Sequence, residues 1–66
     1  MQITLNGQPH DCKPSATVAA LLAETGHGAR RVAVEVNHQI VPRSQHDRHT
    51  LRDGDQVEIV QAIGGG

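Results

Sequence analysis

The chain has 66 residues, a formal net charge of -1 and an aromatic content of 0%, and these properties exclude several classes of protein. A chain of this length forms one small domain and offers little volume for the walled pocket that an enzyme usually needs. It has no aromatic rings on which nucleic-acid bases could stack and no excess positive charge to attract polyphosphates or anionic membranes. We therefore expect a carrier or binding module rather than an enzyme, with neither a nucleic acid nor a membrane as its partner.

The cysteine content and the N-terminal residues bear on cellular location. Cys12 is the single cysteine and cannot form an internal disulfide, whereas small secreted domains usually depend on several disulfides. Residues 1–5 lack the charged segment and apolar run of a signal peptide. The longest apolar runs fall short of the roughly 18 residues of a membrane span. These features predict a cytoplasmic protein.

The N-terminal residues predict a β-hairpin. Apolar and polar residues alternate over residues 1–5, as in a strand with one face on the core. Asn6-Gly7 is typical of a type I′ turn, which returns the chain into a second strand over residues 8–12. Because Pro9 lacks an amide proton, this second strand is expected at a sheet edge.

A short helix is predicted after the hairpin. Val18, Leu21 and Leu22 follow the helical period. Thr17 is a suitable N-cap, and Gly26 is the expected stop. A helix of about two turns is not stable alone, so its apolar side must pack on a sheet.

The middle of the chain predicts two further strands and an irregular connection. Residues 32–36 alternate with valines on one face, residues 37–38 form a turn, and residues 39–41 pair back until Pro42 interrupts the pairing. Ser44 is expected to cap a short helical turn.

The last third of the chain predicts an anchor, a turn and a final strand. Leu51 is an isolated apolar residue that would attach the irregular connection to the core. Asp53 and Asp55 flank a glycine, and such aspartates bond nearby amides in turns, which favours a structural over an acid-base role. The final strand is expected over residues 56–62.

This order of elements predicts an α+β fold. The economical arrangement is a mixed sheet of four to five strands packed on one helix, with the first and last strands adjacent and parallel at the centre. That arrangement is the β-grasp, or ubiquitin-like, fold. We expect one domain over residues 1–62 and a flexible C-terminal glycine tail over residues 63–66.

The C-terminal glycines are the most informative feature of the sequence. Gly64, Gly65 and Gly66 follow a strand that should be central, and glycines present no side chains, so such a tail can enter a narrow channel in another protein. The α-carboxylate of Gly66 is a poor electrophile and needs activation by ATP before a nucleophile can attack it. Because the sequence has no phosphate-binding motif of its own, the activating enzyme must be a separate partner. Taken alone, the glycines could equally be a frayed end.

Several segments spread along the chain carry a family resemblance. They are residues 1–3, 17–18, 21–22 and 36–37, the Ile-Val-Pro-Arg run at 40–43, the turn and strand at 53–57, and the final glycines. On these segments the sequence resembles the ThiS family, the sulfur carriers of thiamine biosynthesis.

The resemblance implies a carrier function centred on Gly66. An E1-like, ThiF-type adenylyltransferase would use ATP to adenylylate Gly66, and a persulfide derived from a cysteine desulfurase would supply the sulfur of a thiocarboxylate. A ThiG-type thiazole synthase would then receive that sulfur. Gly64 and Gly65 would thread the tail into the partner active sites. The chain itself would bind no cofactor and catalyse no step.

Three other functions stay open on the sequence. A ubiquitin-like protein modifier would use the same adenylate to form an isopeptide bond, although Lys13 is the only lysine from which chains could grow. A molybdopterin-type sulfur carrier shares the tail and fold, but such carriers tend to be longer and lack the Val-Pro-Arg run. A plain interaction module would have a tail without chemistry.

The final strand suggests where a partner docks. If Val57 and Ile59 face the core, then Glu58, Val60 and Ala62 lie on the opposite face and leave an apolar spot beside the tail. We expect Val60 and Ala62 to contact a partner. The alternative is that a neighbouring loop covers them.

The cysteine and the histidines suggest other chemistry only weakly. Cys12 has no neighbour except Lys13 to activate it, and we interpret it as a small buried hydrophobic residue. The pairs His10/Cys12 and His46/His49 each offer two ligands, which do not make a metal site. The histidines are therefore expected on the solvated surface, with no metal bound. The ThiS family often has an aromatic residue in place of His46.

Overall fold

The computed structural model describes residues 1–28 and 31–61, and the order of elements is the predicted one. The elements are β1 (Gln2–Leu5), β2 (Gln8–Asp11), α1 (Val18–Glu24), β3 (Val32–Val36), β4 (Gln39–Val41), the 3₁₀ turn η1 (Arg43–Gln45) and β5 (Gln56–Gln61). No helix in the described part of the chain has the length and apolar character needed to cross a membrane.

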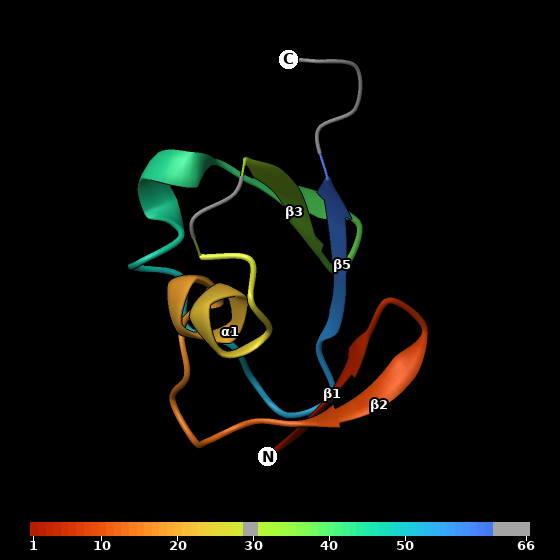
Figure 1. Cartoon of the computed structure of the whole chain (residues 1–66). Helices are drawn as coiled ribbons and strands as arrows, with labels where there is room; N and C mark the ends of the chain where they lie inside the picture. The colour runs from red at the N-terminus through yellow and green to blue at the C-terminus, as the bar shows by residue number, and fades with distance from the viewer. Residues whose placement is uncertain (29–30, 62–66) are drawn as a thin grey trace.

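The strands of these residues form one mixed sheet in the order β2-β1-β5-β3-β4. β5 is parallel to β1 and antiparallel to β3, and α1 lies on one side of the sheet (Figure 1). The first and last strands are therefore neighbours inside the sheet, as predicted for a β-grasp fold. β2, with Pro9, is an edge strand.

Both hairpins turn through residues with positive φ. Asn6 and Gly7 have φ values of 50° and 82°, and Asn37 and His38 have values of 53° and 67°. Turns of this kind match the right-handed twist of the strands that they connect. The first hairpin follows the Asn-Gly prediction, and the second shows that a non-glycine pair tolerates the same conformation here.

The helix has the predicted cap and the predicted buried side. The Thr17 hydroxyl accepts a hydrogen bond from the Ala20 amide at 3.1 Å, and Gly26, with φ of 84°, follows the end of the helix. The apolar stripe of α1 packs against the inner face of the sheet in one core. The buried residues of this core are Ile3, Cys12, Val18, Leu21, Leu22, Val34, Val36, Val41, Leu51, Val57 and Ile59.

The irregular connection after β4 is attached to the core as expected at Leu51. This side chain is fully buried, and its amide donates to the Ala16 carbonyl at 2.8 Å. The Asp-Gly-Asp turn follows it. Asp53 Oδ1 accepts from the Gln2 amide at 2.8 Å, and Asp55 Oδ2 accepts from the Arg52 amide at 2.8 Å. Both carboxylates therefore have structural roles. Asp55 bonds a nearby turn amide as predicted, whereas Asp53 bonds an amide of β1.

Two predictions for this connection were wrong. Ser44 does not cap the helical turn, because η1 begins at Arg43 and Ser44 lies inside it, after an N-cap at Pro42 that makes no side-chain hydrogen bond. Pro42 has an extended backbone, with φ of -57° and ψ of 146°, which is typical of an N-cap residue.

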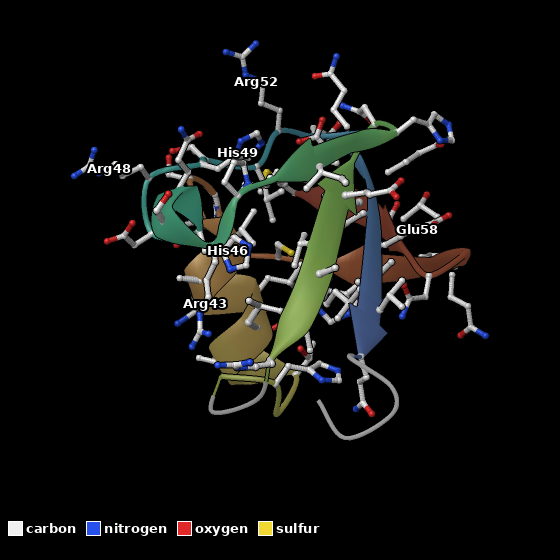
Figure 2. The ribbon with its side chains drawn as sticks, turned by 90° about the horizontal axis from the view of Figure 1, so that it is seen from above. Arg43, His46, Arg48, His49, Arg52 and Glu58 are labelled. Carbon is white, nitrogen blue, oxygen red and sulfur yellow. The ribbon has the colours of Figure 1, made fainter. Side chains whose placement is uncertain are left out.

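The second wrong prediction concerns His46, which is 8% exposed rather than solvated. Its Nε2 lies 3.1 Å from the Val41 carbonyl oxygen, and its own carbonyl accepts from the Ala19 amide at 2.8 Å. Figure 2 shows the ring directed toward the interior. In a chain without aromatic residues, this imidazole fills core volume between the connection and α1.

Candidate functional site

The candidate site is the C-terminal half of β5, because the glycines follow this strand in the sequence. β5 is paired along its length with β3, from Val36↔Val57 to Val32↔Gln61. Its pairing with β1 is limited to Thr4↔Gln56 and Leu5↔Val57. The end of β5 is therefore positioned chiefly by β3.

A side chain from the first hairpin continues the support of β5 beyond this pairing. The Asn6 amide donates to the Val57 carbonyl at 2.9 Å. Asn6 Oδ1 accepts from the Ile59 amide at 2.8 Å. The Asn-Gly turn therefore has a second role that the sequence did not indicate, since it satisfies a backbone donor two residues before Gln61.

The two sides of β5 differ as predicted. Val57 and Ile59 are buried, whereas Glu58 is exposed and Val60 is 52% exposed. Within the described residues no loop covers Val60, so the alternative in which a neighbouring loop hides this side chain is not observed. Ala62 and the glycines Gly64, Gly65 and Gly66, which complete the predicted site, lie outside the described residues.

The outer face of the sheet carries a second exposed apolar residue that sequence reasoning missed. Ile40 on β4 is 71% exposed, while the next residue, Val41, is buried. Successive side chains of a strand point to opposite faces, so a strand that buries Val41 must expose Ile40. This was the signal available in the sequence. Ala33 adds a smaller apolar side chain, directly opposite Val60.

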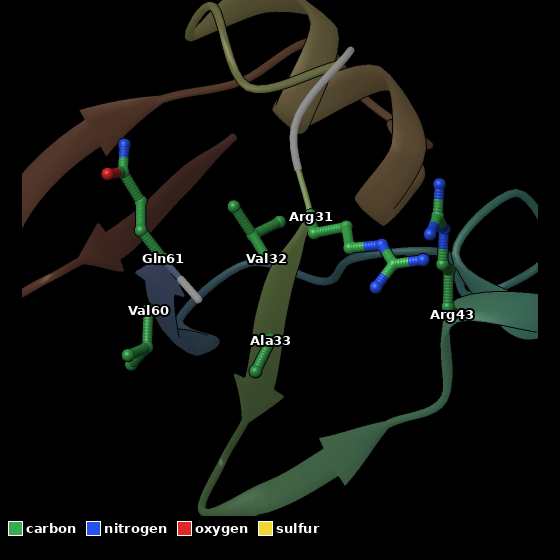
Figure 3. Close-up of a pocket in the computed structure, with 6 residues that line it drawn as sticks. All are labelled: Arg31, Val32, Ala33, Arg43, Val60 and Gln61. Carbon is green, nitrogen blue, oxygen red and sulfur yellow. The ribbon is translucent and has the colours of Figure 1, made fainter. Parts of the chain in front are cut away.

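An open hollow of about 450 Å³ lies at the end of β5. Val60 and Ala33 point to one side of the sheet there, and Val32 and Gln61 point to the other (Figure 3). The remaining lining residues are Arg31 and Arg43. Apolar side chains next to exposed guanidinium groups are suited to contact with another protein, where Arg and apolar residues are enriched.

The other candidate groups do not assemble into a reactive site. Cys12 is buried in the core, and burial, followed by the charge of Glu24, raises the pKa of its thiol. His10 Nε2 pairs with Glu24 Oε1 at 2.8 Å, a contact that the sequence did not predict. Among residues 1–28 and 31–61, no three His, Cys, Asp or Glu side chains come together as a metal site.

Comparison with known proteins matches this description to one family. A model of the ThiS family matches residues 3–66. The sulfur carrier protein ThiS of Escherichia coli is 41% identical over 66 residues, which is 100% of both chains. A crystal structure of the thiamine biosynthesis protein ThiS from Geobacter metallireducens superposes with a TM-score of 0.86, at 36% identity and 100% coverage of both chains.

A second kind of relative is much longer. A thiazole synthase of Paramagnetospirillum magneticum is 47% identical over all 66 residues, yet this chain spans 20% of its length. A thiazole synthase of Magnetococcus marinus is 41% identical, again over 20% of its length. A segment like this chain is therefore part of proteins named for thiazole synthesis.

Proposed function

Because the chain belongs to the ThiS family, we propose that it is a sulfur carrier in the biosynthesis of the thiazole of thiamine. Gly66 is the residue that carries the sulfur, as a C-terminal thiocarboxylate. The observation that carries this proposal is a β-grasp sheet in which a central strand, β5, leads into three terminal glycines. The domain thereby provides a fixed base from which the tail reaches a partner.

The proposed chemistry takes place at the α-carboxylate of Gly66 in the active sites of partners. A carboxylate oxygen attacks the α-phosphorus of ATP, pyrophosphate leaves, and an acyl-adenylate forms. A sulfur nucleophile then attacks the carbonyl carbon and displaces AMP. With hydrosulfide as the nucleophile, one proton is released and the product is the thiocarboxylate. The adenylyltransferase binds the ATP, and this chain is its substrate rather than an enzyme.

Membership of the ThiS family suggests three partners for this chemistry. An adenylyltransferase of the ThiF type activates Gly66, and a cysteine desulfurase supplies sulfur as a persulfide. The persulfide displaces AMP to give an acyl disulfide, and a thiol of a partner then attacks the sulfur on the partner's side, which releases the thiocarboxylate and leaves a disulfide. A thiazole synthase of the ThiG type accepts the sulfur. The two relatives named thiazole synthase, which contain a segment similar to this chain, support the last of these partners. Proteins that occur joined in one chain commonly act on one another.

We propose that Val60, with Ala62 beyond it, forms part of the docking surface for these partners. Val60 is exposed next to the end of β5, and exposed apolar surface next to a reactive group is what a transient complex can cover. Gly64 and Gly65 pass through the channel of the partner, because side chains would obstruct it.

Intact-mass measurement tests the proposal. The protein is incubated with ATP, a sulfide source and the purified activating enzyme, beside a variant that lacks Gly66. We expect a gain equal to the replacement of one oxygen by sulfur in the full chain and no gain in the variant. An unchanged mass without adenylate, or a ladder of heavier isopeptide conjugates, would overturn the carrier assignment.

A further inference from the structure

β5 continues after its neighbour β1 has ended. The two strands pair as far as Leu5↔Val57, and Asn6 then turns the chain into the first hairpin (Figure 1). On its other side β5 keeps its ladder with β3 as far as Gln61. In the described part of the chain, the last residues of β5 therefore have a strand partner on one side only.

The Asn6 side chain replaces the strand partner that is missing at this point. In a regular parallel ladder, a residue donates its amide to a carbonyl of the neighbouring strand, and its own carbonyl accepts from the amide two residues further along that strand. Asn6 makes the first bond with its backbone, to the Val57 carbonyl at 2.9 Å. It makes the second with its side chain, because Oδ1 accepts from the Ile59 amide at 2.8 Å. The side chain thereby extends the ladder by one bond past the end of β1.

The amide that Asn6 binds belongs to the last core residue of β5. Ile59 is 8% exposed, whereas Val60 is 52% exposed and Gln61 is also exposed. β5 therefore leaves the core at Ile59. At this point its backbone is held by Val34 of β3 on one side and by the Asn6 side chain on the other. The direction of the strand end depends on both contacts.

A second asparagine makes a similar pair of bonds at the other end of β5. Asn37, with φ of 53° in the second hairpin, donates its amide to the Gln56 carbonyl at 2.7 Å, and its Oδ1 accepts from the Gln56 amide at 3.0 Å. Its Nδ2 also donates to Asp55 Oδ1 at 3.0 Å. The two asparagines thus have alike local contacts at opposite ends of one strand, and Asn6 is the one next to the residues that precede the tail.

The turn itself does not require asparagine at position 6. Glycine adopts a positive φ without strain, and Gly-Gly pairs form the same type of turn. Asparagine tolerates this region of backbone conformation and adds a side-chain oxygen, which glycine lacks. The particular contribution of Asn6 is therefore its bond to β5.

We propose that Asn6 is a positioning residue of the carrier, whose side chain holds the end of β5 so that Gly66 is delivered to the ATP of the activating enzyme. The inference rests on the proposed carrier function. The exposed surface around Val60 provides binding, whereas Asn6 determines where the tail starts once the complex has formed. Without the bond to Ile59, each complex must first order the end of β5, and small displacements of the reacting atoms lower the rate of a transfer.

Single-turnover adenylylation tests the inference, because it separates binding from chemistry. The purified activating enzyme is in excess over the carrier, and pyrophosphate release is followed over a range of enzyme concentrations. We expect Asn6→Gly to lower the limiting rate roughly fivefold, the factor that corresponds to one hydrogen bond. The half-saturating enzyme concentration should change little, because the docking surface is intact. Asn6→Asp retains an acceptor oxygen and should recover most of the rate.

Asn37→Gly is the matched control. It makes the same substitution at a turn residue with positive φ, and it removes two side-chain hydrogen bonds rather than one, but at the start of β5. Its limiting rate should match that of the unmodified chain. The assay is run below the unfolding midpoint of the least stable variant, and circular dichroism checks that every variant is folded.

The outcomes separate this inference from the proposed function. If the unmodified chain is adenylylated and Asn6→Gly reaches the same limiting rate, or if Asn37→Gly loses as much, the positioning role is overturned and the carrier function stands. If Asn6→Gly raises only the half-saturating concentration, Asn6 contributes to binding, and the positioning role is again overturned. If the unmodified chain is not adenylylated, the proposed function fails, and the inference fails with it.

Discussion

The two faces of the sheet come from the same strands, yet they have different tasks. The inner face contributes Ile3, Val34, Val36, Val57 and Ile59 to a core that α1 closes. The outer face exposes Ile40 and Val60 beside two opposed glutamates, and no element of the described chain covers it. The comparison teaches that apolar character alone does not assign a residue to stability. What counts is whether the chain supplies its own cover.

The largest loss of stability is expected from a substitution on the inner side of the molecule. Leu21→Ala removes a fully buried side chain of α1 and should lower the free energy of unfolding by about 2–5 kcal/mol, because it removes buried apolar surface and leaves a cavity. Urea denaturation followed by circular dichroism measures the change. Val60→Ala is the matched control on the outer face and should stay within about 0.5 kcal/mol. Equal losses for the two variants would contradict the division between the faces.

A charge placed on the outer face should affect binding and spare folding. Val60→Asp puts a carboxylate into the apolar part of the proposed docking surface, and we expect the affinity for the activating enzyme to fall by roughly tenfold or more. Calorimetry measures the affinity, and circular dichroism checks the fold. Ser44→Asp is the control, because it adds the same charge at an exposed residue of η1 beside α1 rather than on the outer face of the sheet. Loss of the fold in Val60→Asp would show that this side chain belongs to the core.

A smaller effect tests how the end of β5 is supported. Asn6→Gly removes the acceptor for the Ile59 amide while keeping a residue that tolerates positive φ. The expected loss is about 1 kcal/mol of unfolding free energy, the usual contribution of one hydrogen bond. Asn6→Asp retains an acceptor oxygen and should lose less. Amide hydrogen exchange at Ile59 provides a local readout, and unchanged protection in Asn6→Gly would contradict the role of this side chain.

The smallest expected effect concerns pH at the inner face. Burial, and then Glu24, raises the pKa of the Cys12 thiol above its ordinary value of 9.0. The folded state therefore holds the proton more tightly than the unfolded state. The associated stability is complete below the ordinary pKa of the thiol and is lost as the pH rises through the higher folded pKa.

Cys12→Ala isolates this contribution, because all other titrating groups stay in place. Thermal unfolding of both proteins from neutral to alkaline pH should show a steeper decline for the unmodified chain at alkaline pH. Parallel profiles would mean that the thiol titrates alike in both states.

Much of the fold was predictable because its signals are local. The Asn6-Gly7 turn, the Thr17 cap and the alternating valines of β3 each depend on neighbouring residues, and the structure confirms them. Ser44 was assigned wrongly because η1 already begins at Arg43, after Pro42. His46 was assigned wrongly because its burial depends on how the connection after β4 folds back toward α1, and nearby sequence carries no sign of that contact.

The part of the candidate site on β5 was predictable from the sequence, whereas the parts on β3 and β4 were not. Val60 followed from the alternation of one strand, whereas the opposition of Glu35 and Glu58 depends on the register between strands separated by the whole connection. The pairing of Ile40 with Glu35 likewise exists only once β4 has folded back on β3.

The sequence by itself determined the kinds of elements, the apolar face of each element and the family of the chain. Periodicity, turn chemistry and motifs depend only on residues that are close together in the sequence. The tertiary structure decided which apolar residues are covered. It also brought the two glutamates together, buried His46 and joined Asn6 to Ile59. These are contacts between distant residues, and they depend on strand order and register, which no local segment specifies.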